Sequence, residues 1–295
     1  MPLSRIKNQS VETVMKTGRR NLLINGNFKI WQRDNDRDHT GSGWDYLSCD
    51  RFLHNKGRYQ QVDETVEGKS VKAMKISPSS GVYNGGRGVL QRIEEYDIYE
   101  HDLIFSAYVK SDAAHTVSFG NVYTGSVTSN SKTISLTTDW KRYSIKIPAS
   151  SHTLTQVPDQ YLITNFTDGR TYYIANAQLE FDYGNGIPSP FEYRSTQEEL
   201  RLCHRYFYRW ASAVPASSGT LREWVYNIDD NDSYRRGPHR FPIPMRNTPT
   251  CTITWNGTPG SGRGLQHISN TMCNPWVDGV STYAYYTDFT AEAEL

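Results

Sequence analysis

Short strand-like runs separated by turn residues recur along the first two thirds of the chain, and no other feature constrains the fold as strongly. Each run holds about four to eight residues, and turn pairs such as Ser-Gly and Asp-Gly lie between the runs. Because successive strand side chains point to opposite faces, alternating runs predict strands with one buried face. The runs span residues 71–76, 88–93, 103–110, 116–121, 132–136, 140–147, 161–165 and 172–179. We therefore expect an all-β jelly roll or β-sandwich.

The alternation also predicts which side chains face the core. In the run 103–110, one face holds Phe105, Ala107 and Val109, and the other holds Ile104, Ser106 and Tyr108. In the run 172–179, we expect Tyr173, Ala175, Ala177 and Leu179 to point inward. Trp140 stands at the entry to a strand, and we expect it to fill the core there.

A second, smaller β-rich domain follows over residues 196–295. Thr196 and Glu199 have the spacing of a capping box, which predicts a short helix of about one to two turns that acts as a hinge. Strands are then expected at 205–210, 223–228, 250–255, 264–269 and 283–294. The jelly roll itself is expected over residues 21–195.

Residues 1–20 are polar and basic, with isolated apolar side chains at Ile6, Val11 and Val14. So little apolar surface cannot form a core alone. We expect an assembly arm that orders only against another chain and buries these three residues there. A frayed tail is the alternative.

Composition excludes several classes of partner. Only 37% of the residues are hydrophobic, whereas 13% are aromatic, which favours sheets over helical bundles. The net charge is +1 with acids and bases interspersed, so nucleic acid is not an expected partner. Neither a run long enough to span a membrane nor a signal-peptide core is found. We expect synthesis in a cytoplasm and no membrane insertion.

The sequence contains no pattern of catalytic residues. The eight histidines are scattered, and the cysteines stand singly at Cys49, Cys203, Cys251 and Cys273, so we expect no metal and no cofactor. These cysteines are expected as reduced thiols, with two disulfides as the alternative in an oxidising compartment. Asp34, Asp36 and Asp38 are interpreted as a solvated acidic loop, because the Gly and Glu of a calcium loop are missing. We expect that the protein is not an enzyme.

Four segments in order carry a resemblance to a known family. They are Asn21-Leu-Leu-Ile-Asn-Gly-Asn-Phe-Lys-Ile-Trp-Gln-Arg33, Tyr172-Tyr-Ile-Ala-Asn-Ala-Gln-Leu-Glu180, Pro188-Ser-Pro-Phe-Glu-Tyr-Arg194 and Glu198-Glu-Leu-Arg-Leu-Cys-His-Arg-Tyr-Phe-Tyr-Arg209. Together they resemble the carbohydrate-binding-module-like jelly-roll domain of bacteriophage tail fibres and other virion proteins. Residues 241–250 and 289–295 resemble the part of such fibres that lies beyond the Leu-Cys-His-Arg-Tyr segment. The opening segment is interpreted as a strand at 22–24, a turn at Gly26 and a resumed strand at Phe28 and Ile30.

The resemblance implies a structural virion protein, most simply a phage tail fibre assembled in the host cytoplasm. Its N-terminal arm would attach it to tail or baseplate proteins, and its C-terminal domain would bind a host-surface polysaccharide. A homotrimer is implied, with Tyr206, Tyr208 and the C-terminal aromatic residues near its axis. A capsid decoration or cement protein and a non-catalytic carbohydrate-binding module are the alternatives. Modules of this class commonly hold a calcium ion on the last strand, where this chain has Ala175 and Ala177, which cannot ligate it.

Exposed aromatic residues beside polar groups are the expected receptor contacts in the C-terminal domain. Sugar rings bury apolar area against aromatic faces, while polar side chains orient the hydroxyls. The candidates, placed in the C-terminal loops, are Trp255, Trp276, Tyr283, Tyr285 and Tyr286. Core packing is the alternative role for each of them.

Overall fold

The computed structural model describes residues 20–41, 43–79, 88–94, 101–124, 127–129, 132–149, 159–164, 169–182, 184–211, 223–225, 233–235, 238–257, 262–278 and 284–294. The expected assembly residues Ile6, Val11 and Val14, and the candidate contact Tyr283, lie outside these residues. The chain divides into two compact units between Thr196 and Gln197. Each unit has a hydrophobic core of its own.

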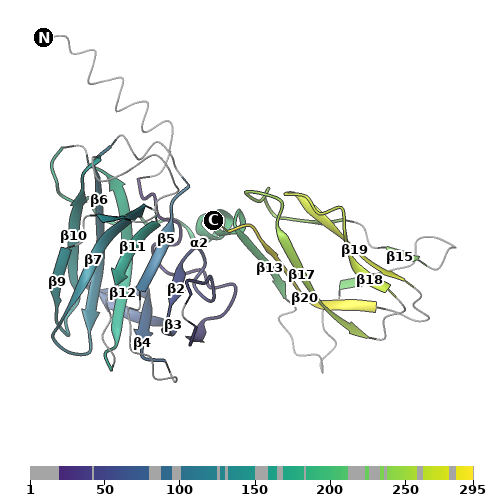
Figure 1. Ribbon diagram of the computed structural model, residues 1–295, viewed down its shortest axis with the longest axis horizontal. Coiled ribbons are helices and arrows are strands. Elements are labelled where there is room, and N and C mark those ends of the chain that lie inside the picture. Colours follow the sequence, from purple (N-terminus) through teal and green to yellow (C-terminus); the bar gives the residue numbers. More distant parts are fainter. Residues whose placement is uncertain are drawn as a thin grey trace, which may run out of the picture. The chain divides into compact units, whose positions relative to one another are not determined.

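The first unit is a sandwich of two antiparallel sheets (Figure 1). The first sheet has the order β1 (Asp36–His39), β3 (Gly57–Val66), β4 (Lys69–Ser77), β12 (Tyr172–Phe181), β6 (Leu103–Ser111), β10 (Lys141–Ile147). The second has the order β2 (Leu53–Asn55), β5 (Gly88–Arg92), β11 (Asp159–Thr164), β7 (His115–Thr124), and both β8 (Val127–Ser129) and β9 (Lys132–Leu136) pair with β7. Their inner faces form one core, in which the rings of Phe105 and Phe119 lie 4.8 Å apart. The all-β sandwich is confirmed.

The predicted faces are confirmed for β6 and half wrong for β12. Phe105, Ala107 and Val109 all lie in the main core. On β12 the buried core positions are Tyr172, Ile174, Ala177, Leu179 and Phe181. A bulge between Ala175 and Gln178, with Asn176 at a φ of 50°, inserts one residue and shifts the alternation. Strict period two cannot describe a strand that changes phase in its middle.

Two further expectations for the first unit are wrong. The acidic residues thought to form a solvated loop include Asp36, which begins strand β1 and accepts a hydrogen bond of 2.7 Å from Arg58 on β3. The opening segment is not a pair of strands but irregular chain, since the Asn25 side chain bonds the backbone of Ile30 in place of a ladder. Gly26 is required there, because a Cβ would lie 2.1 Å from the Ala177 carbonyl oxygen.

Helix α2 (Thr196–His204) starts at the boundary between the units, at the place the capping box predicts. One sheet of the second unit contains β20 (Ala284–Glu292), flanked by β17 (Thr250–Gly257), β13 (Phe207–Ala211) and β14 (Glu223–Val225). The other contains β19 (Met272–Asp278), flanked by β18 (Gly262–Gln266), β15 (Ser233–Arg235) and β16 (His239–Arg240). Residues of both sheets share a core around Phe289 and Cys273.

Candidate functional site

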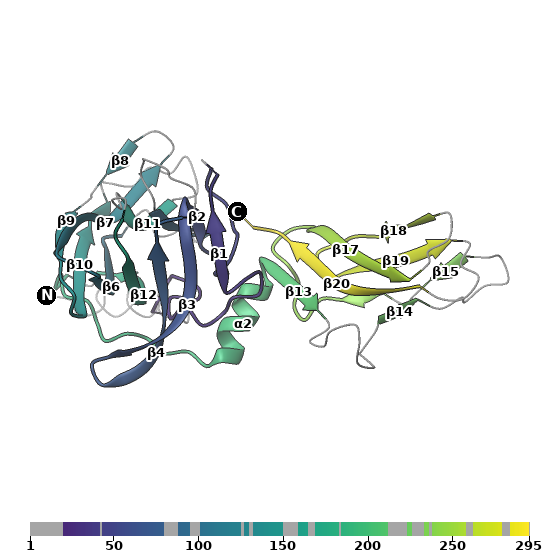
Figure 2. The same ribbon diagram turned by 90° about the horizontal axis from the view of Figure 1, so that it is seen from below.

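The β3–β4 hairpin is long and strongly curved (Figure 2). Val66 and Val71, near its tip, are buried in a small apolar cluster with Tyr108 of β6 and Ala175 of β12. Tyr108 and Ala175 lie on the side of the sheet away from the main core, because their strand neighbours Val109 and Ile174 face the core. The hairpin therefore bends over the outer face of the first sheet.

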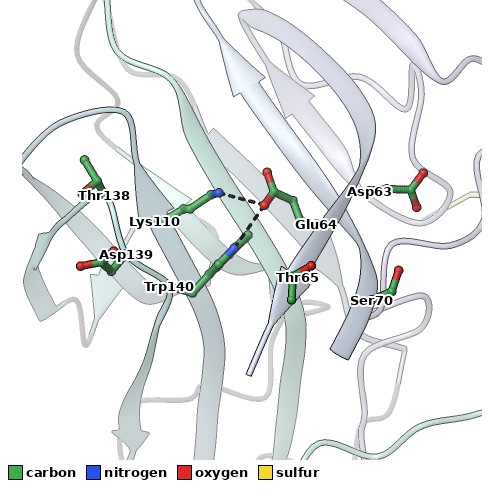
Figure 3. Close-up of a pocket in the computed structure, with 8 residues that line it drawn as sticks. All are labelled: Asp63, Glu64, Thr65, Ser70, Lys110, Thr138, Asp139 and Trp140. Atoms are coloured by element: carbon green, nitrogen blue, oxygen red, sulfur yellow. Dashed lines mark hydrogen bonds and ion pairs between the residues drawn. The ribbon is translucent and has the colours of Figure 1, made fainter. Parts of the chain in front are cut away.

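A hollow of about 500 Å³ opens beside this cluster. Residues of the hairpin, of β6 and of the turn before β10 line it (Figure 3). They are Asp63, Glu64, Thr65, Ser70, Lys110, Thr138, Asp139 and Trp140. An indole, three carboxylates and three hydroxyls thus surround one space.

Glu64 connects the two sides of the hollow. Its Oε2 atom accepts a hydrogen bond of 2.8 Å from Lys110 Nζ and a longer one of 3.4 Å from Trp140 Nε1, as Figure 3 shows. The Lys110 ammonium also lies 5.0 Å from the ring centre of Trp140 and 4.6 Å from that of Tyr173. These contacts hold the indole in one orientation.

Trp140 does not fill the core, contrary to the sequence-based expectation. It is half-buried and packs against the outer cluster. The reason is its register: Lys141 pairs with the inward-facing Val109, so the residue before Lys141 falls on the opposite face. The Trp140 side chain consequently lines the hollow.

The candidate contacts in the second unit lie on strands, not in loops. Trp255 is on β17 and packs against the core of this unit. Trp276 is on β19, where its indole Nε1 would lie 3.0 Å from a Cβ built on Gly264. Tyr285 and Tyr286 are on β20. Strand β15 begins its pairing with β19 at Trp276 and β16 ends its pairing at Cys273, so Pro275, which has no N–H to donate, falls between these two short strands.

The two tyrosines expected near a trimer axis are packed within the second unit itself. Tyr206 is only 2% exposed. Tyr208 packs against the core, and its ring centre lies 6.3 Å from that of Phe289. Their burial in one chain explains why aromatic residues occur at these positions.

Sequence reasoning did not identify Glu64, Lys110 and Tyr173 as site residues. Glu64 belongs to β3, whose mostly polar sequence Arg-Tyr-Gln-Gln-Val-Asp-Glu-Thr gives little strand signal. Tyr173 and Lys110 are direct cross-strand partners on β12 and β6. Only the pairing register could have indicated that they meet.

Three of the segments that carry the family resemblance meet in one polar network. The Asn21 side chain donates to the carbonyl of Ala177 at 3.0 Å and accepts from the backbone N–H of Leu179 at 3.0 Å. Glu192 accepts from the backbone N–H of Asn21 at 2.8 Å, and Arg194 donates to the carbonyl of Asn21. We call this set the clasp. It joins the two ends of the first unit to β12, so these residues close the fold.

Two kinds of feature are missing from the described residues. No group of three or more His, Cys, Asp or Glu side chains in these ranges could hold a metal ion. Within the same ranges, no helix has the length and apolar character needed to cross a membrane.

Comparison with known proteins finds similar solved structures. A family 16 carbohydrate-binding module is 16% identical, with a TM-score of 0.34, over 54% of this chain and 99% of the module. The family 11 module of a cellulosomal cellulase of Clostridium thermocellum is 17% identical, with a TM-score of 0.31, over 50% of this chain and 96% of the module. A Stig cyclase of Fischerella is 10% identical, with a TM-score of 0.39, over 55% of this chain and 98% of the cyclase. No protein-family model and no curated protein matches the sequence.

Proposed function

We propose that the first unit binds a carbohydrate chain in the hollow beside Trp140. The observation that carries this proposal is the indole held by Glu64 and Lys110 at the edge of a polar space. A sugar ring buries its apolar face against an aromatic ring, while carboxylate and hydroxyl oxygens bond its hydroxyls. The resemblance of the sequence to carbohydrate-binding-module-like domains agrees with this proposal.

The charges of the hollow favour a neutral sugar chain. Asp63, Glu64 and Asp139 line it together with a single ammonium, that of Lys110, among its eight lining residues. An acidic polysaccharide would bring like charges together, which is unfavourable in a partly desolvated site. We therefore expect glucans or mannans to bind better than uronic acid polymers.

We further infer binding without catalysis. Glu64 already accepts hydrogen bonds from Lys110 and Trp140, and Asp63 is paired with Lys72 at 2.8 Å. A glycoside hydrolase needs one carboxyl group that can give a proton and a second that can attack or activate water. Because Glu64 and Asp63 are each already paired with a lysine ammonium, they are suited to positioning a sugar chain rather than to cleaving it. Incubation with a bound polysaccharide should release no reducing ends.

Affinity electrophoresis of the full chain through gels that contain neutral or acidic polysaccharides tests the proposal. Trp140→Ala should lose about tenfold in affinity for the retarding polymer, because a stacked ring contributes on the order of 1 kcal/mol or more. Ile187→Ala, which removes an apolar side chain that is 68% exposed, is the matched control and should bind normally. If folded Trp140→Ala is retarded like the parent protein, the hollow is not the site.

The biological setting that we propose is a phage tail fibre acting as a homotrimer, with residues 1–20 attached to tail or baseplate proteins. The ordered resemblance of the four segments supports it. Sedimentation should give a trimer, and Trp276→Ala with Tyr285→Ala should leave the trimer intact and reduce adsorption to host cells. A trimer with unchanged adsorption would favour the capsid decoration protein instead.

A further inference from the structure

Two cysteine side chains meet inside the second unit. Cys251 lies on β17 and Cys273 on β19, and a hydrogen bond joins their thiols. Both belong to the same apolar core around Phe289. Cys273 is fully buried, whereas Cys251 is partly exposed. None of the four cysteines forms a disulfide in this structure.

The two thiols come from different sheets. Cys251 pairs with Ala291 of β20, and β20 also pairs with β13 and β14. Cys273 pairs with His239 of β16, in the sheet centred on β19. A bond between these sulfurs would therefore connect the two layers of the unit across its core.

We propose that Cys251 and Cys273 are a built-in disulfide site, which closes when the protein meets a small-molecule disulfide such as oxidised glutathione. The thiolate of Cys251 attacks one glutathione sulfur, forms a mixed disulfide and releases one glutathione. The thiolate of Cys273 then attacks the Cys251 sulfur and releases the second glutathione. The two cysteines lose two electrons, which reduce the glutathione disulfide, and their two protons pass to the released thiols.

The order of attack follows from exposure and from the contact between the thiols. Cys251 can be reached from solvent, and the hydrogen bond from Cys273 lowers its pKa even though burial opposes the shift. By contrast, burial raises the pKa of Cys49 well above its ordinary value, so that thiol should not react. Reaction should thus be selective for the pair.

Closing this site should stabilise the second unit more than an average contact does. Its described core is built around few side chains, namely Phe241, Met245, Cys273, Phe289, Ala291 and Ala293. A disulfide restricts the unfolded chain, and for loops of roughly 15 to 25 residues the effect is large enough to raise the Tm of a small unit by about 10 °C.

Peptide mapping of the full chain after exposure to oxidised glutathione tests the proposal. We expect a cross-linked peptide that contains Cys251 and Cys273, the loss of two titratable thiols, and a higher Tm that dithiothreitol reverses. Cys251→Ser should abolish all three effects, and because this side chain is partly exposed, the variant should fold. Cys203→Ala, which removes a thiol of α2, is the control that should keep them.

Two results would overturn the proposal. One is a glutathione adduct that persists on Cys251 with no cross-linked peptide, since a sulfur within bonding reach should displace it. The other is a cross-link with unchanged Tm that also forms in urea at the same rate, because the native contact would then play no part.

Discussion

At the scale of single residues, the clasp shows how polar side chains close a sandwich. Arg194 is buried, and its guanidinium donates to the carbonyl groups of Asn21 and Leu23 and pairs with Glu192 at 3.0 Å. Irregular chain such as 21–31 leaves backbone groups that no ladder satisfies, and buried groups of this kind need partners. Side chains from the far end of the unit supply them.

We expect Arg194→Ala to destabilise the first unit by about 2–4 kcal/mol, because it leaves two carbonyl groups without their donor and removes the cation paired with Glu192. Urea unfolding followed by tryptophan fluorescence measures the change. Arg20→Ala is the control: this arginine is exposed, and its loss should change the free energy of unfolding by about 0.5 kcal/mol or less. Equal effects of the two changes would refute a structural role for the clasp.

Glu192 makes the clasp sensitive to acid. Desolvation alone would raise its pKa, but the backbone N–H groups of Asn21 and Arg20 and the charge of Arg194 outweigh it and hold the pKa below its ordinary value of 4.5. The folded state then binds fewer protons than the unfolded state, so this contribution is complete above the ordinary pKa and is lost as pH falls through the folded one. Stability measured from pH 6 downward should fall less steeply in Glu192→Gln than in the parent.

At the scale of elements, the bulge in β12 decides which residues reach the core. Asn176 adopts a left-handed backbone conformation, and its side chain donates to the Tyr193 hydroxyl at 3.1 Å. Without the extra residue, Ala177 and Leu179 would point away from the main core that they fill. The bulge also leaves Ala175 under the β3–β4 hairpin.

We expect Asn176→Val to cost about 2 kcal/mol or more, because a β-branched residue at positive φ is strained and the bond to Tyr193 is lost. Asn176→Gly should cost less than half as much, since glycine accepts this conformation. Denaturant midpoints compare the two variants. A larger loss with Gly than with Val would mean that the side-chain bond, rather than the backbone conformation, maintains the bulge.

At the scale of the whole molecule, two cores of different size imply two stabilities. The first core draws on both six-stranded sheets, whereas the described core of the second unit centres on Phe289 and a few neighbours. Burial of apolar area is the main favourable term in folding, and a smaller core provides less of it. The second unit should therefore be the less stable one.

We expect the full chain to unfold in two steps in urea, with residues 197–295 losing protection from hydrogen exchange first. Arg194→Ala should move only the later step, and oxidation of the Cys251–Cys273 pair only the earlier one. A single cooperative step that both changes move equally would show that the units unfold together.

Local sequence was sufficient wherever local chemistry decides the structure. The run 132–136 became strand β9 with unchanged bounds, and the capping box at Thr196 marked the start of α2. Alternation and caps involve neighbours only a few residues apart, so a reader of the sequence can weigh them. The alternation of side chains also assigned Phe105, Ala107 and Val109 to one face of β6, and all three lie in the main core.

The candidate site, by contrast, depended on contacts between distant residues. Glu64 and Trp140 are 76 positions apart, and a curved hairpin brings them together. Cys251 and Cys273 meet only because two sheets pack face to face. The sequence by itself determined the strands with clear alternation, the helix and the class of fold, because these depend on short-range alternation and backbone preference. Only the tertiary structure decided the bulge phase, the hollow and the thiol pair, because register and packing bring together residues that no local pattern connects.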